Sequence, residues 1–324
     1  MSRVKHAVAR ILTVALLVLL AGTAAAQQAY PNRPITLVVP YGPGSGNDVI
    51  ARILAAKISD NWGHPVVVVN RPGATGGLAL ETVAKSAPDG YTIVIASTSQ
   101  IVNQHLSNMR YDFLRDFAPV SLAGSMPFVV AVLSKFPANT MRDLVEVAKT
   151  SPRKLNHTGT VGSIQHFMAE LLKSTAKIDM VLVPTKLVAD GEADVLSGRV
   201  EVWIITFNSA LARAKSGTVK VLAITGDRRS PELPNVPTMD EAGFPALNIV
   251  AAYYILAPVG TPSSITGILN REFVKAMDSK EVKDRLAAAG VTPKSSTPEE
   301  LGALLKRDVP KWGKIVKDSG VRVD

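Results

Sequence analysis

Short apolar runs, each followed by a polar loop and then by apolar residues at helical spacing, dominate the first third of the chain. The runs are Ile35–Val39, Pro65–Val69 and Tyr91–Ala96. Runs of this length, rich in β-branched residues, are typical of strands buried on both faces of a parallel sheet. The pattern therefore predicts three strand–loop–helix units of an α/β fold, with the first helix starting at or just after Asp48 and a polar loop over Ser97–Gln100.

A second series of strands and helices follows Asp116–Ser125, a mixed stretch without a clear period. Its first helix, Thr140–Thr150, has Thr140 as a plausible N-cap and Asp143 as the capping partner. The other predicted strands span 128–133, 154–156, 180–183, 200–205, 219–225 and 250–256, and the other helices span 164–174, 191–196 and 208–215.

The last part of the chain is predicted to be helical, at 263–277, 280–289 and 298–319. Helices after residue 256 need a sheet to cover, so the second series is predicted to be inserted into the first. Two α/β lobes joined by two connections form a clamshell with a ligand in the cleft, each lobe a mostly parallel sheet flanked by helices. The predicted boundaries are 27–123 with 253–324 for lobe 1, and 124–252 for lobe 2.

The loop after the first strand is the leading candidate for a binding site. It carries Gly42, Gly44 and Gly46 directly before a predicted helix. Its backbone N–H groups face outward without obstruction by Cβ atoms, at the positive end of a helix dipole. A second loop, HTGTVGS at 157–163, has the same character in the second series. Two such loops at the carboxyl ends of strands predict a site for a small carboxylate.

Composition narrows the class of protein. Arg3, Lys5 and Arg10 precede an apolar run, Ile11–Leu20, and a small-residue cleavage site at Ala24–Ala26, so residues 1–26 are predicted to be a secretory signal peptide. Cleavage would remove three of the cationic residues and lower the formal charge from +9 to +6. The remaining Lys and Arg are scattered, which argues against nucleic-acid binding. The chain has no cysteine, so an exported protein must rely on its core for stability.

Three kinds of chemistry lack their sequence signals. The glycine loop has neither the Lys-Ser/Thr of a P-loop nor the G-x-G-x-x-G spacing of a dinucleotide site. The histidines are dispersed, without the H-x-x-x-H spacing of a metal site. Ser45 and Ser163 lack the G-x-S-x-G context of a hydrolase nucleophile. The sequence therefore predicts no catalytic residue, no metal and no cofactor.

Several segments, in order and spacing, resemble the Bug family, the substrate-binding proteins of tripartite tricarboxylate transporters. The likeness covers nearly the whole mature chain. The segments are YPNRPITLVVPYGPGSGND (Tyr30–Asp48), PVVVVNRPGATGG (Pro65–Gly77), APDGYTIVIAS (Ala87–Ser97), DFAPVSLAGS (Asp116–Ser125), GSIQH (Gly162–His166), RRSPELPNVPTMDEAGFP (Arg228–Pro245) and LAPVGTP (Leu256–Pro262).

The resemblance implies a periplasmic type II binding-protein fold, in which two lobes enclose a carboxylate and present it to a membrane transporter. It also implies that backbone amides and hydroxyls of the two glycine loops hold the carboxylate. The chain departs from the family pattern at Thr185, Leu187, Ile205 and Ala252, where the family often has a tyrosine, a glycine, an aspartate and a tryptophan. The anchor is therefore expected to be kept and the distal pocket to be remodelled.

The leading prediction is a monomeric periplasmic receptor that delivers a small organic acid to a membrane transporter. A ligand-dependent sensory subunit for a membrane sensor and, with less support, an exported hydrolase using Ser45 or Ser163 remain as alternatives. Asp48 is expected to cap its helix, and Tyr41 either lines the cleft or packs. The predicted ligand-binding residues are Tyr41, Gly42, Gly44, Ser45, Gly46, Asn47, Thr98, Ser99, Gly162, Ser163, Gln165 and Thr185.

Overall fold

A computed structural model describes residues 30–150, 155–185 and 187–320, so the predicted signal peptide lies outside the described residues. The chain divides into two units, Met1–Asn32 and Arg33–Asp324, and all the described helices and strands belong to the second. Within the described ranges, no helix combines the length and the apolar character needed to cross a bilayer.

The first part of the sheet is parallel, as its apolar runs predict. The central strand, β1, pairs with β2 and β3, so that Leu37 lies opposite Val68 on one side and Ile93 on the other. A helix follows each strand, which confirms the three predicted units. The elements are β1 (Ile35–Val39), α2 (Gly46–Trp62), β2 (Val66–Asn70), the short turn η1 (Ala74–Gly76), α3 (Gly77–Ala84), β3 (Thr92–Ser97) and α4 (Thr98–Leu106).

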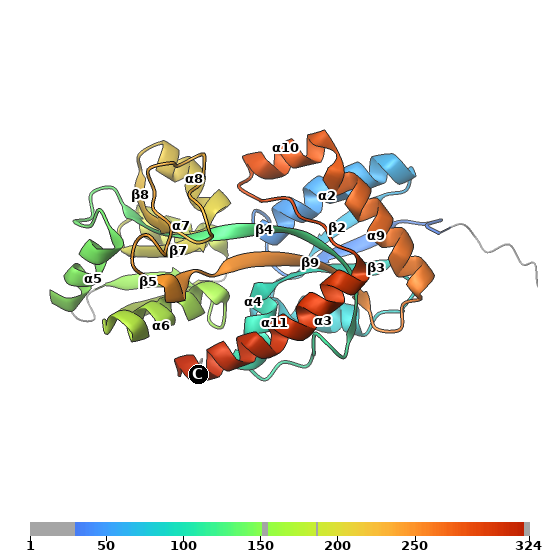
Figure 1. The fold of residues 1–324 in the computed structure, drawn as a ribbon, viewed down its shortest axis with the longest axis horizontal. Coiled ribbons are helices and arrows are strands. Elements are labelled where there is room, and N and C mark those ends of the chain that lie inside the picture. The colour runs from blue at the N-terminus through green and yellow to red at the C-terminus, as the bar shows by residue number, and fades with distance from the viewer. Residues whose placement is uncertain (1–29, 151–154, 186, 321–324) are drawn as a thin grey trace, which may run out of the picture. The chain divides into compact units, whose positions relative to one another are not determined.

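Two long strands, β4 (Phe117–Leu133) and β9 (Val250–Pro258), connect the first part of the sheet to the second. β9 pairs antiparallel with β3 and with residues 117–127 of β4, whereas residues 128–133 of β4 pair with β7 and β8. Figure 1 shows β4 and β9 side by side between the two groups of elements. The sheet is mixed, with the order β2-β1-β3-β9-β4-β7-β5-β6 and β8 paired with β4.

The second part repeats the parallel arrangement in β7, β5 and β6. Its core contains Val129, Trp203 and Phe207, all buried. The elements are α5 (Met141–Thr150), β5 (Asn156–Gly159), α6 (Ile164–Ala176), β6 (Val181–Pro184), α7 (Val188–Leu196), β7 (Val202–Thr206), α8 (Phe207–Lys215) and β8 (Val219–Ile224).

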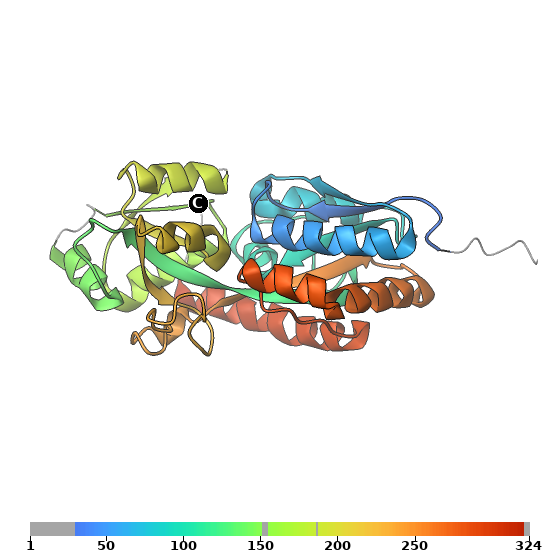
Figure 2. The same ribbon diagram turned by 90° about the horizontal axis from the view of Figure 1, so that it is seen from above.

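The C-terminal helices return to the first part of the sheet, as predicted. Figure 2 shows α9 and α10 alongside α2, and Lys57 Nζ of α2 lies 3.0 Å from Glu281 Oε2 of α10. The last helix has the predicted capping box, because Thr297 and Glu300 each accept the other's backbone N–H. The elements are the short turn η2 (Pro245–Leu247), α9 (Ser263–Asp278), α10 (Lys280–Ala288) and α11 (Pro298–Ser319).

Residues His157–Gly159, which were predicted to be part of the second glycine loop, belong to the strand β5. Three further local predictions are wrong, each for an identifiable reason. Residues Ser97–Gln100 are not a loop, because the Gln100 side chain accepts from Ser97 and lets α4 begin at Thr98. Asp116–Ser125 is mostly part of β4, where two register shifts interrupt the alternation that would have identified a strand. The first helix begins at Gly46, two residues before Asp48, because Ser45 is its N-cap.

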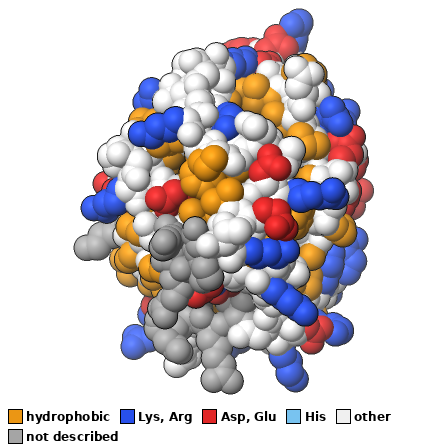
Figure 3. All heavy atoms as spheres, turned by 90° about the vertical axis from the view of Figure 1, so that its left-hand side faces the viewer, with side chains coloured by type: hydrophobic (Ala, Val, Ile, Leu, Met, Phe, Trp, Pro, Cys, Tyr) orange, Lys and Arg blue, Asp and Glu red, His pale blue; other side chains and the backbone are white. Residues whose placement is uncertain are grey.

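The surface shown in Figure 3 carries Lys and Arg interspersed with Asp and Glu. This mixed pattern agrees with the scattered charges of the sequence. On this face the basic residues form no continuous stripe of the kind that tracks a nucleic-acid backbone.

Candidate functional site

A cavity of about 160 Å³ lies at the carboxyl ends of strands from both parts of the sheet. The loop after β1 and the start of α2 contribute Tyr41 to Pro43 and Ser45 to Asn47. The end of β3 contributes Ser97, and the start of α4 contributes Ser99. The second part contributes the ends of β5, β6 and β7, and β9 contributes Ala251 and Tyr253. The carboxyl edge of an α/β sheet is where ligands are expected.

Five of the helices in the described part of the chain begin at this cavity. Their N-cap residues, which are Ser45 of α2, Ser97 of α4, Ser163 of α6, Leu187 of α7 and Thr206 of α8, all line it. The first turn of each helix leaves backbone N–H groups without carbonyl partners inside the helix. Each helix N-terminus also carries about half a positive charge from the aligned peptide dipoles. The convergence creates a positive potential in the cavity, and none of the described lining residues carries a charged side chain.

The first glycine loop is held in shape by Asp48. Gly44 has a φ of +81°, which favours glycine, and its N–H donates to Asp48 Oδ2 at 3.0 Å. Burial by itself would raise the pKa of Asp48, but hydrogen bonds from Arg52, Asn70 and Gly44 hold that pKa below its ordinary value. The Asp48 carboxylate is therefore ionised, and it accepts a hydrogen bond from the loop. The Ser45 hydroxyl caps α2 by accepting from Asp48 N.

The second loop has a matching N-cap. Ser163 Oγ accepts from His166 N at 3.2 Å, as Ser45 Oγ accepts from Asp48 N at 3.3 Å. Gly162 has a φ of +76°, and its N–H donates to His166 Nδ1 at 3.2 Å. In both loops the serine oxygen accepts a bond from its own helix, so the hydroxyl proton stays available to an anion in the cavity.

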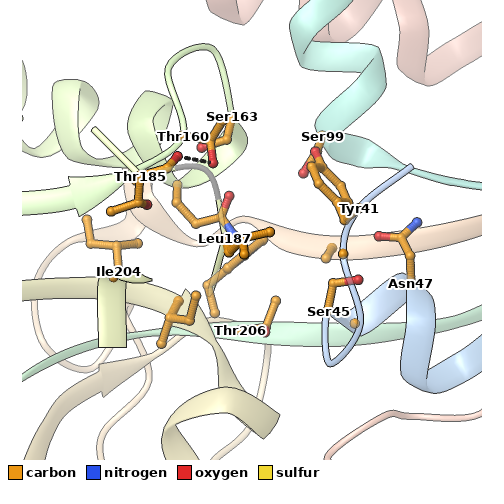
Figure 4. Close-up of a pocket in the computed structure, with 18 of the residues that line it drawn as sticks. Tyr41, Ser45, Asn47, Ser99, Thr160, Ser163, Thr185, Leu187, Ile204 and Thr206 are labelled. Carbon is orange, nitrogen blue, oxygen red and sulfur yellow. Dashed lines mark hydrogen bonds between the residues drawn. The ribbon is translucent and has the colours of Figure 1, made fainter. Parts of the chain in front are cut away.

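The loops of the two halves approach each other near the cavity. Thr75 Oγ1 donates to Val161 O at 2.7 Å. A Cβ atom built on Gly42 would lie 3.2 Å from Leu187 Cδ2. The hydrogen bond from Thr75 therefore joins the two halves of the chain, and Gly42 lies close to Leu187. Figure 4 shows Tyr41, Ser45 and Ser99 on one side of the cavity and Thr160, Thr185 and Ile204 on the other.

A buried histidine pair lies beneath the second loop. His157 on β5 is fully buried, and neither of its ring nitrogens has a hydrogen-bond partner among the described residues. The ring of His157 stacks on that of His166, with the two ring centroids 6.1 Å apart. Burial, followed by the charges of His166 and Lys173, lowers the pKa of His157 to about 3, and burial lowers the pKa of His166 as well.

The pair predicts a loss of stability in acid. Between pH 6.5 and about 3 the unfolded chain binds a proton at residue 157 that the folded chain does not bind, so stability falls as the pH falls through this window. One such histidine contributes about 2 kcal/mol of destabilisation at pH 5. His157→Leu removes the titrating group, so urea unfolding should show a smaller loss between pH 7.5 and 5 than in wild type. An equal loss in both proteins would contradict the assignment.

Nine of the twelve predicted ligand-binding residues line the cavity: Tyr41, Gly42, Ser45, Gly46, Asn47, Ser99, Ser163, Gln165 and Thr185. Gly44, Thr98 and Gly162 do not line it. The Thr98 hydroxyl accepts from Ala252 N at 3.0 Å and therefore holds β9. Asn47 also has a structural contact, because its side-chain amide donates to Ile95 O at 2.8 Å.

Sequence reasoning did not place several cavity residues in the site. Ser97 could have been found from its capping box with Gln100, and Thr206 from its position before a helix. The apolar members carry no such signal, because core residues follow the same pattern. Leu187 and Ile205 were noted only as departures from the family pattern, although both line the cavity. The other missed residues are Pro43, Ser97, Phe128, Thr158, Gly159, Thr160, Ala189, Gly191, Trp203, Ile204, Thr206, Ala251 and Tyr253.

Comparison with known proteins identifies the chain's relatives. BugT of Bordetella pertussis is 35% identical over 94% of this chain and 95% of its own length. The structure of MatC from Rhodopseudomonas palustris with bound malate is 29% identical, with a TM-score of 0.83 over 89% of this chain and 100% of that one. The R. palustris protein Rpa4515, solved with adipate, is 31% identical, with a TM-score of 0.84 over 90% of this chain and 99% of that one.

The family model described as the tripartite tricarboxylate transporter family receptor matches residues 50–321. This match covers most of the chain, and the solved relatives share the two-part α/β fold and include periplasmic binding proteins. The chain therefore belongs to the family of tripartite tricarboxylate transporter receptors.

Proposed function

We propose that this protein is a periplasmic receptor that binds a small organic carboxylate in the cavity and presents it to a tripartite tricarboxylate transporter in the membrane. The observation that carries the proposal is the convergence of five helix N-termini on one cavity. Neutral amides and hydroxyls can stabilise an anion there without the desolvation of a buried salt bridge. The malate and adipate bound by two relatives are carboxylates of suitable size.

The ligand contacts that we propose are the nine predicted residues that line the cavity, with the hydroxyls of Ser45 and Ser163 as opposed donors. Gly44 and Gly162 support these contacts through their left-handed backbone, and Thr98 through its bond to β9. We also propose lobe boundaries near residues 123 and 252, which lie in β4 and β9, the two long strands that connect the two parts of the sheet.

The arrangement around the two serines supports binding without catalysis. His166, next to Ser163, uses Nδ1 to accept from Gly162 N. Asp48, next to Ser45, is occupied by Arg52, Asn70 and Gly44. A serine nucleophile needs a base that takes its proton, and the two neighbouring groups form hydrogen bonds with other partners instead. We infer a monomeric, exported protein that acts through ligand capture alone.

A thermal-shift screen with mono-, di- and tricarboxylates tests this function. The exported protein should first be refolded from urea to remove any co-purified ligand. A bound carboxylate at 100 times its Kd should add about 3 kcal/mol to the free energy of unfolding, and the melting temperature should rise. The corresponding neutral amides serve as controls and should not raise it. A folded protein whose melting temperature no organic anion changes would contradict the proposal.

A further inference from the structure

A hydrogen bond between the two halves of the chain lies outside the cavity lining. Thr75, in the short turn η1 of the first half, donates from Oγ1 to the carbonyl oxygen of Val161 at 2.7 Å. Val161 belongs to the loop between β5 and α6 in the second half, two residues before Ser163. Thr75 and Val161 do not line the cavity, whereas Ser163 does. The bond therefore joins the two halves beside the site without being part of it.

The turn that carries Thr75 has a strained backbone. Ala74 has a φ of +47° and Thr75 a φ of +53°. Residues other than glycine seldom adopt a positive φ, and for a β-branched residue such as threonine it is a genuine outlier. Backbone strain of this kind persists only where the surrounding structure holds it, and it is concentrated at ligand clamps and switch regions.

Side chains of the first half hold the turn in this conformation. Asn103 Nδ2 donates to Ala74 O at 3.2 Å, and Gln100 Nε2 donates to Thr75 O at 3.4 Å. Both donors come from α4 and are fully buried. The hydroxyl of Tyr41, which lines the cavity, donates to Thr75 O at 3.4 Å as well. Because all three bonds lie within the first half, the Thr75 hydroxyl is oriented before it meets its partner, and orienting it costs little further entropy.

The second half approaches this turn closely through a glycine. A Cβ atom built on Gly162 would lie 3.1 Å from Asn103 Oδ1 and 3.5 Å from Thr75 Oγ1. Gly162 is buried and has a φ of +76°. The missing side chain lets the backbone of the second loop lie directly against the first half. The fit between the two loops therefore extends beyond the single bond from Thr75.

The connections between the halves allow this contact to open. The strands β4 and β9 connect the two parts of the sheet, and Thr75 and Val161 lie in different parts. A rotation of one part against the other about these strands would separate the two residues. Phe167 of α6 also packs edge-on against Trp312 of α11, with the ring centroids 6.5 Å apart. Loss of the bond from Thr75 should therefore weaken the closed arrangement without abolishing it.

We propose that Thr75 is a positioning residue that holds the two halves together once a carboxylate has entered the cavity, and that it raises the affinity for that carboxylate without touching it. This inference rests on the proposed function, since it assumes that the cavity receives a ligand. The bond to Val161 forms after the ligand has entered, so it slows dissociation and leaves association unchanged.

Thr75→Val tests the proposal, because valine has the shape and the β-branching of threonine but no hydroxyl. The dissociation rate constant should rise about three- to tenfold, as expected for one net hydrogen bond, and the association rate constant should stay the same. Trp203 lines the cavity, so stopped-flow fluorescence can follow both steps. The probe is the acid among benzoate, malate, adipate and citrate that raises the melting temperature of the refolded wild type most. Without the acid, urea unfolding should give the same stability as wild type.

Two matched variants serve as controls. Thr75→Ser keeps the hydroxyl and should dissociate within about twofold of the wild-type rate. Thr82 Oγ1 donates to Leu78 O at 2.7 Å inside α3, so Thr82→Val removes a similar bond that does not join the halves, and both rate constants should stay unchanged.

The outcomes separate the role of Thr75 from the proposed function. Dissociation from Thr75→Val at the wild-type rate, or equal acceleration in Thr75→Ser, would overturn the role of Thr75 and leave the carboxylate receptor intact. A loss of stability in Thr75→Val without the acid, with both rate constants unchanged, would show a merely structural role and would overturn it too. Binding of none of the four acids by wild type would overturn both.

Discussion

Replacing Ser163 by aspartate is expected to lower the affinity for a carboxylate about 10²- to 10³-fold while the protein stays folded. Ser163 is the N-cap of α6, it is buried, and it lines the cavity. Aspartate is as good an N-cap as serine, so the helix should be kept. The new charge would lie about 4 Å from the ligand, where like charges repel by roughly 4 kcal/mol at an effective dielectric constant of about 20.

The control for this variant is Ser163→Asn, which caps the helix without adding a charge. Its affinity should fall far less than that of the aspartate variant, and urea unfolding should give similar stabilities for the two proteins. The same pair at Ser45 tests the opposite loop, because Ser45 has the same cap geometry on α2. Equal affinities of the aspartate and asparagine variants, measured by calorimetry, would show that the loops bind no anion.

Gly46→Ala is expected to reduce stability by about 1–3 kcal/mol, because it overpacks a site that cannot relax easily. A Cβ atom at residue 46 would lie 2.2 Å from the Tyr253 hydroxyl and 3.0 Å from the ring carbon that bears it. Tyr253 is buried in the strand β9, which pairs with both β3 and β4, so its backbone is held in place on both sides. Displacement of the first turn of α2 should also weaken ligand binding.

A double-mutant cycle with Tyr253→Phe identifies the cause. Removal of the hydroxyl takes away the closest contact, so the alanine substitution should be less destabilising in the phenylalanine background than in wild type. We expect a coupling free energy of about 1–2 kcal/mol from urea unfolding of the four proteins. Additive effects would mean that the alanine acts through the backbone of the glycine loop and not through contact with Tyr253.

Local sequence patterns predicted most of the secondary structure, because strands and helices bury their apolar residues with different periods. They failed where a local hydrogen bond or an irregular strand changes the pattern. Ser97–Gln100 is polar, yet its capping box begins α4. Asp116–Ser125 lies largely in β4, but the register shifts of that strand remove the alternation.

The same limit applies to the candidate site. Ser45 and Ser163 could be predicted, because glycine-rich loops between a strand and a helix have a local signature. Phe128, Trp203 and Tyr253 could not be predicted, because an apolar residue in a buried strand has the same sequence context whether it faces a core or a cavity. The neighbours of Tyr253 show the reason, since it approaches Gly46 from a position more than 200 residues later in the chain.

By itself the sequence determined the alternation of strands and helices, the insertion of one α/β series into another and the two loops suited to an anion. These features follow from local periodicity and from glycine and serine at helix starts. Only the tertiary structure decided that five of the described helices begin at one cavity, that the Asp48 carboxylate accepts from the backbone of the first glycine loop, and that Leu187, Ile204 and Ile205 line the same cavity. Strand order and register fix these relations, and they join residues far apart in the chain whose proximity no local pattern encodes.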